Sequence, residues 1–167
     1  MSVKKANQVD RGEKTSPPIN LATLYSGRSQ HAVDDSNRIM LPSAWRVEGA
    51  PTQFFVLLVA DTTDHLLVLT PSGFEALLAE LRADTADQDE IPVIERQLTD
   101  RVRQVSLDRV GRLPLPADLL ARANIEKQGE LVGRFSKFEI WPGNKEKSAG
   151  TETQALLPRL ATKLKRA

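Results

Sequence analysis

One pattern occurs twice in this chain, and it limits the fold more than any other feature. The pattern is an apolar residue and Asp, then three residues, Arg, Ile or Leu, one residue, and Leu-Pro. It spans residues 33–42 and again 107–116, so each matched position recurs 74 residues later. A repeat of this kind sets the architecture and is read before any other signal. The chain therefore contains one structural unit twice, and each unit places an acid and a base around a turn.

The segments around the two copies predict the same series of elements: strand, turn, strand, short helix, strand and strand. The first repeat covers about 21–82 and the second about 101–142, inside one domain at 20–142. This order lacks the alternation of a βαβ fold. It predicts an α+β fold of mainly antiparallel strands, a small barrel of two similar halves with connecting helices. Residues 1–19 are expected to form a disordered arm, and 143–167 a polar tail with a short basic amphipathic segment.

Two helices are predicted between the repeats. Ser72 and Glu75 have the spacing of a capping box, which places the start of the first helix there. Pro92 suits the first turn of the second helix. The apolar face of that helix is expected to comprise Val93, Ile94 and Leu98.

Composition excludes several classes of protein. The 167 residues contain no cysteine, which argues against a disulfide scaffold, a cysteine nucleophile and the usual structural zinc site. The longest apolar run, 54–60, is far too short to span a membrane. The net charge of +1 is unevenly distributed along the chain: residues 1–19 carry +2, residues 143–167 carry +4, and the residues between them carry −5. A DNA-binding protein with an acidic body must concentrate its positive charge on one face or in an oligomer.

The repeated acid and base allow two interpretations. An Asp at the start of a turn accepts backbone amides and can hold a guanidinium four residues later. Arg38 and Arg112, held in this way by Asp34 and Asp108, would be positioned for a phosphate or a guanine edge. Each pair could equally be a surface salt bridge that only stabilises its turn. Spacing and composition leave both interpretations open.

The residues resemble a known family at this point. The segments 25–42, 108–116 and 131–141 are similar to the corresponding parts of MraZ proteins, and the match covers about residues 24–142. The resemblance implies an AbrB-like swapped-hairpin (double-split) barrel with an internal pseudo-two-fold repeat. It also implies ring-shaped homo-oligomers. The implied function is a transcriptional regulator that binds repeated promoter sequences of the division and cell-wall gene cluster.

The resemblance also assigns roles to residues. It implies that Arg38 and Arg112 bind double-stranded DNA, oriented by Asp34 and Asp108. The turn positions before the two arginines are Asn37 and Gly111, which tolerate left-handed backbone angles.

This chain departs from the family pattern at the turns. A Lys often stands two residues before each Arg in the family, where this chain has Ser36 and Val110. We expect Arg28 and Arg109 to supply the missing charge. The family usually has Gly before the first Arg, where this chain has Asn37.

Other chemistry is weakly supported. The two histidines, His31 and His65, have no third partner for a metal site, and no phosphate-binding loop or catalytic motif is present. Trp45 and Trp141 are expected to fill the barrel or an oligomer contact. We expect a cytoplasmic, nucleoid-associated protein that is not an enzyme and needs no cofactor, small-molecule substrate or membrane. The alternative is an oligomeric scaffold or interaction module of the same fold with weak or no DNA binding.

Overall fold

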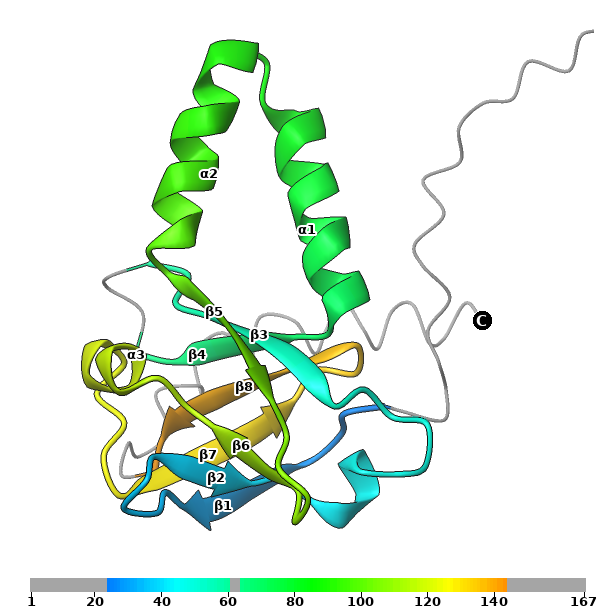
Figure 1. The fold of residues 1–167 in the computed structure, drawn as a ribbon, viewed down its shortest axis with the longest axis vertical. Helices are drawn as coiled ribbons and strands as arrows, with labels where there is room; N and C mark the ends of the chain where they lie inside the picture. The colour runs from blue at the N-terminus through cyan, green and yellow to red at the C-terminus, as the bar shows by residue number, and fades with distance from the viewer. Residues whose placement is uncertain (1–23, 61–63, 144–167) are drawn as a thin grey trace, which may run out of the picture.

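The computed structural model describes residues 24–60 and 64–143. The predictions of a disordered arm at 1–19 and of a basic amphipathic segment within 143–167 lie outside these residues, apart from Gly143. The fold is α+β with mainly antiparallel strands, as predicted (Figure 1). The strands are β1 (Arg28–Ala32), β2 (Arg38–Met40), β3 (Gln53–Leu57), β4 (Leu66–Leu69), β5 (Val102–Ser106), β6 (Arg112–Pro114), β7 (Gln128–Gly133) and β8 (Lys137–Pro142). The helices are α1 (Pro71–Asp84), α2 (Ile91–Thr99) and α3 (Ala117–Arg122), with 3-10 turns at Ser43–Trp45 and Gln88–Glu90.

The strands reproduce the sequence repeat as a pseudo-two-fold arrangement. The main sheet has the order β1-β7-β8-β4-β3-β5, and exchanging each strand for its counterpart in the other repeat gives the same order reversed. The first strand of each repeat pairs with the other repeat, β1 with β7 and β5 with β3. Neither repeat could therefore bury its strands alone. The described strands close no barrel, because β1 and β5 end the six-stranded sheet and β2 forms a separate two-stranded sheet with β6.

β2 and β6 form a separate two-stranded ribbon, and their register places Ile39 opposite Leu113. Both side chains are fully buried, so one face of the ribbon covers the core. Side chains alternate along a strand, so the residues on either side of Ile39 and Leu113 lie on the opposite, outer face of the ribbon. Pro114 lacks an N–H, and the sequence predicted an edge or bulged strand there; β6 has only one partner strand.

Aromatic side chains fill the space between ribbon and sheet. Tyr25 packs against Trp45, Phe54 and Phe138 with ring centroids 5.1 to 6.3 Å apart. The Trp45 indole N–H donates to the Ser26 carbonyl at 3.1 Å, which gives its polar atom a partner inside the core. Of the two roles expected of Trp45, filling the interior is confirmed, although the described strands close no barrel.

Trp141 has a different role, because it is only partly buried and stacks on His65 with ring centroids 4.1 Å apart. Of the two roles expected of Trp141, filling the barrel is therefore wrong, and an oligomer contact stays a prediction.

α1 and α2 project from the sheet as a helical hairpin (Figure 1). The predicted capping box is wrong: Thr70 caps α1 by accepting the Gly73 N–H at 3.1 Å, and Pro71 is already helical. Proline favours the first helical position, so the true cap stands just before it.

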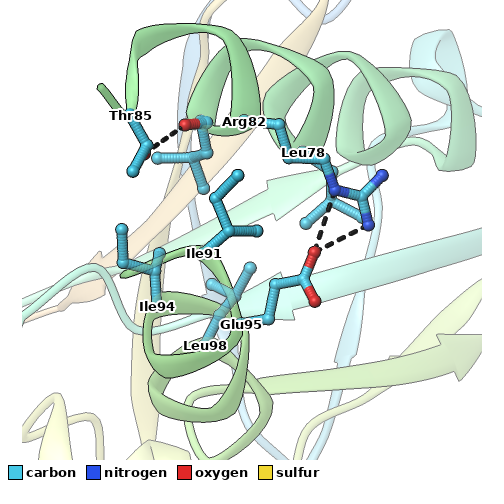
Figure 2. Close-up of a pocket in the computed structure, with 8 residues that line it drawn as sticks. Leu78, Arg82, Thr85, Ile91, Ile94, Glu95 and Leu98 are labelled. Carbon is cyan, nitrogen blue, oxygen red and sulfur yellow. Dashed lines mark hydrogen bonds and ion pairs between the residues drawn. The ribbon is translucent and has the colours of Figure 1, made fainter. Parts of the chain in front are cut away.

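The apolar face of α2 is also corrected. Val93 is 51% exposed, whereas Ile94 and Leu98 face α1 (Figure 2). A helix repeats every 3.6 residues, so Ile91, Ile94 and Leu98 share a face and Val93 does not.

Candidate nucleic-acid interface

The first repeated motif forms a turn that is held by its own acid. Asp34 Oδ1 accepts the backbone N–H of Ser36 and of Arg38, both at 2.9 Å. Asp34 Oδ2 accepts the Arg38 Nε–H at 3.0 Å. Asn37 adopts φ +59°, the left-handed conformation that the sequence predicted. One carboxylate therefore fixes both the backbone of the turn and the direction of the guanidinium.

The second motif repeats this geometry 74 residues later. Asp108 Oδ1 accepts the backbone N–H of Val110 at 3.0 Å and of Arg112 at 2.9 Å. Asp108 Oδ2 accepts the Arg112 Nε–H at 2.6 Å. Gly111 adopts φ +94°, a conformation that glycine takes at little cost. The two turns are equivalent in backbone and in the hydrogen bonds that their own Asp accepts.

The two motifs also contact each other. Arg38 Nη1 lies 3.7 Å from Asp108 Oδ2, and Arg112 Nη1 lies 3.8 Å from Asp34 Oδ2. The backbone has the same reciprocity, since Leu41 N–H donates to the Gly111 carbonyl and Leu115 N–H to the Asn37 carbonyl. We call Asp34, Arg38, Asp108 and Arg112 the quartet. It is one cluster built across the pseudo-two-fold axis from both repeats.

The quartet lies on the outer face of the ribbon. Arg38 and Arg112 flank the buried residues Ile39 and Leu113 along β2 and β6, and their side chains remain 33% and 32% exposed. The sequence predicted two tethered guanidinium groups on turns. It did not predict that each would approach the carboxylate of the other turn, because that contact depends on the pairing of strands distant in sequence.

Hydrogen bonding lowers the pKa of both acids in the quartet. The Arg38 backbone N–H is the largest influence on Asp34 and lowers the pKa of that carboxyl below its ordinary value. The Arg112 backbone N–H does the same for the pKa of Asp108. Partial desolvation opposes both shifts without cancelling them. Both carboxylates are thus stabilised in the charged form that holds an arginine.

The other two predicted contact residues lie outside the quartet. Arg28 is on the edge strand β1, with its Nε 3.4 Å from Glu130 Oε1. Arg109 is exposed at the centre of the second turn.

Sequence reasoning missed Arg46. Its Nε–H donates to the Leu41 carbonyl at 3.0 Å and its Nη1–H to the Val110 carbonyl at 3.3 Å. The side chain lies so close over Gly111 that a Cβ there would overlap it. Arg46 therefore braces the second turn from the first repeat. No local pattern signals this contact, because 64 residues separate Arg46 from Val110.

The rest of the described structure offers no clear metal, catalytic or ligand site. The described residues contain no group of three or more metal-ligating side chains. His31 bonds to Ser29 Oγ at 2.8 Å, and burial lowers the pKa of that histidine. The hollow between α1 and α2 is apolar, is crossed by the Arg82–Glu95 ion pair, and holds no more than a water-sized molecule (Figure 2). No helix in the described part of the chain is long and apolar enough to cross a membrane.

Comparison with known proteins shows which family the chain is similar to. The family model "MraZ protein, putative antitoxin-like" matches residues 101–146. A protein of Thermomicrobium roseum named transcriptional regulator MraZ is 31% identical over 148 residues, covering 83% of this chain and 99% of that protein. The chain belongs to the MraZ family. The MraZ regulators of Symbiobacterium thermophilum and Shewanella halifaxensis are each 30% identical, over 83% and 71% of this chain and 98% and 79% of their own lengths.

The family model of MraZ matches the second repeat of this chain, including its turn. The stretch 101–146 contains β5, the Asp108–Gly111 turn, β6, α3, β7 and β8. The first repeat has equivalent strands in the same pairing, with the 3-10 turn at Ser43–Trp45 in the place of α3, although the family model does not extend to it. The first repeat therefore has the same strand framework as the matched second repeat.

Proposed function

We propose that this chain is a DNA-binding transcriptional regulator in which Arg38 and Arg112 contact double-stranded DNA. The observation that carries the proposal is the quartet on the exposed face of a two-stranded ribbon. A ribbon of two strands has a shape that fits the major groove. The names of the MraZ relatives add support, because each is called a transcriptional regulator.

The geometry suits an anionic ligand. Within the quartet each arginine uses Nε for its own Asp and turns Nη1 towards the other Asp. A guanidinium carries five N–H donors, so each arginine has donors beyond these two contacts for a phosphate oxygen or a guanine edge. Because Asp34 and Asp108 already order both side chains, binding loses less rotamer entropy. Asn37 and Gly111 maintain the turns that hold the two acids.

Charge balance favours an assembly. The quartet sums to zero, and Arg28 and Arg109 add only two cations per chain to an acidic body. Repeated copies around a ring would place many arginines on one DNA face. Exposed apolar side chains in the described part of the chain support contacts between copies, at Val47, Val59, Val93 and Phe135. We therefore propose a ring-shaped homo-oligomer on promoter repeats of the division and cell-wall gene cluster, acting in the cytoplasm at the nucleoid.

The exchange of strands between repeats supports a swapped-hairpin, AbrB-like description of the domain at 20–142. Each repeat, about 21–82 and about 101–142, supplies the outer strand of the other. The proposed organisation adds an arm at 1–19 and a tail at 143–167.

A gel-shift titration tests the function. The probe is the DNA immediately upstream of the chain's own gene, with a scrambled duplex of equal length as control, at several salt concentrations. Specific retention that weakens steeply with salt supports the proposal. Sedimentation of the same preparation tests the ring. A stable oligomer that retains neither duplex would instead favour a scaffold, the alternative that the neutral quartet and the acidic body suggest.

A further inference from the structure

The two turns of the quartet share a backbone but differ in chemistry. Between Asp34 and Arg38 the first turn carries Asp35 and Ser36, whereas the second carries Arg109 and Val110 at the same positions. Counting each turn from its Asp to its Arg, the first has a net charge of −1 and the second +1.

Arg46 widens this difference. Its Nη1–H donates to the Val110 carbonyl, so a further cation stands beside the second turn. No hydrogen bond of this kind reaches the Ser36 carbonyl among the described residues. The second turn is therefore both more positive and more rigidly held than the first.

The register puts these unlike turns at opposite ends of the ribbon. β2 and β6 run antiparallel, and each turn immediately precedes its strand. At one end of the outer face the first turn presents the acidic Asp35 and the polar Ser36. At the other end the second turn presents the basic Arg109 and the apolar Val110. A ribbon with such ends cannot meet a polyanion equally at both of them.

Val110 is an unusual residue for its position. The Gly111 N–H donates to the Asp108 carbonyl, which places Arg109 and Val110 at the centre of a β-turn. Such positions favour Gly, Asn, Asp or Ser, and β-branched residues are better suited to strands. Val110 is nevertheless 56% exposed there, so it contributes little to the core. Folding gives no account of this choice, whereas contact with an apolar group on a ligand does.

We propose that the second turn is the end of the ribbon that enters the major groove, where Val110 packs on a thymine 5-methyl group. Arg109 contacts a phosphate beside it, and Asp35 keeps the first turn away from the bases. The proposal rests on the DNA-binding function and adds a direction and a base preference to it. The methyl group of thymine is the one apolar group that the major groove presents, and apolar side chains read it. Each ribbon would then lie on its stretch of DNA in one orientation, with the second turn towards the bases.

Removing the thymine methyl groups tests this assignment. Two duplexes of the DNA upstream of the chain's own gene are compared, one natural and one with every thymine replaced by deoxyuridine. The wild-type chain is titrated against both, together with Val110→Ser and the matched exchange Ser36→Val at the first turn. Both positions are exposed turn residues, and thermal unfolding checks that each variant remains folded.

The wild-type chain should bind the deoxyuridine duplex about fourfold more weakly for each thymine methyl group on which a Val110 side chain packs. Val110→Ser should bind both duplexes alike, and Ser36→Val should keep the wild-type difference. An equal loss in the wild type and in Val110→Ser would overturn the inference, as would wild-type binding that ignores the methyl groups. If the wild type retains neither duplex, the proposed function itself fails and the inference fails with it.

Discussion

Arg38 lies with its Nη1 3.7 Å from Asp108 Oδ2, the acid of the opposite repeat, while its Nε bonds to Asp34 in its own turn. Each arginine thus contacts both halves of the duplication. The contact is possible because β2 and β6 pair antiparallel around the Ile39 and Leu113 positions. It turns two separate motifs into one unit on the surface of the ribbon.

The first prediction concerns acid stability. Asp34 and Asp108 have a folded-state pKa below the ordinary value of 3.8, so they bind fewer protons when folded than when unfolded. Their stabilising contribution is complete above that value and is lost as pH falls through the lowered folded pKa. The Asp34→Asn, Asp108→Asn variant should be less stable than the wild type at neutral pH.

Urea unfolding from pH 7 to pH 2 checks this prediction. Below about pH 4 the free energy of unfolding should fall less steeply with pH in the double variant than in the wild type. Parallel curves across this range would show that the two carboxyls do not titrate with folding.

The second prediction concerns the turn glycine. Gly111→Ala should cost about 1–2 kcal/mol, because φ +94° disfavours a side chain. The new Cβ would also overlap Arg46. The matched change Asn37→Gly relieves a left-handed non-glycine residue and should alter stability little. Chemical denaturation compares the two, and equal effects would contradict the account of the turns.

The helical hairpin shows how far sequence reasoning reaches. The 3.6-residue period located α1 and α2, because amphipathic spacing is a local property. It misplaced the start of α1 at Ser72, since Thr70 and Ser72 are both good capping residues and the proline at 71 decides between them.

The duplication predicted the equivalent turns and strands, because both copies carry the same local signals. The pairing of β1 with β7 and the reach of Arg46 to Val110 depend on contacts between distant segments. No local pattern contains that information. The same limit applies to the cross-repeat contacts of Arg38 and Arg112.

The third prediction concerns a buried acid outside the quartet. Glu139 is 7% exposed, bonds to His65 Nε2 at 3.0 Å and lies 3.5 Å from Arg134 Nη1. Glu139→Ala should cost about 1–3 kcal/mol because it leaves these groups without their acceptor. Glu139→Gln keeps an oxygen acceptor for His65 and should cost less. Urea unfolding at neutral pH checks the order, and a larger loss for Gln than for Ala would contradict it.

Glu139 also adds to the acid response. Burial raises its pKa, but the hydrogen bond from His65 and the attraction of Arg134 and Lys137 outweigh burial, and the pKa is lowered overall. Its contribution to stability is therefore present above its ordinary value of 4.5 and is lost as pH falls through the lowered pKa. Glu139→Gln should show a smaller loss of stability than the wild type over that range in pH-dependent thermal unfolding.

The fourth prediction concerns the paired arginines as DNA contacts. Arg112→Ala should weaken binding to the upstream DNA by about 1–3 kcal/mol, because its guanidinium lies in the turn that reads bases. Arg38→Ala should weaken binding about equally for all sequences, as the loss of a phosphate contact does. Arg82→Ala is the matched control, because it removes the same charge from α1 in the helical hairpin (Figure 2). It should leave binding unchanged.

The most direct test of the central claim is a binding titration of the Arg38→Ala, Arg112→Ala double variant on that upstream duplex. Both guanidinium groups lie on one exposed face, so the account predicts that the double variant loses specific binding while remaining folded. Wild-type affinity in the folded double variant would contradict the claim that the quartet is the DNA-binding site.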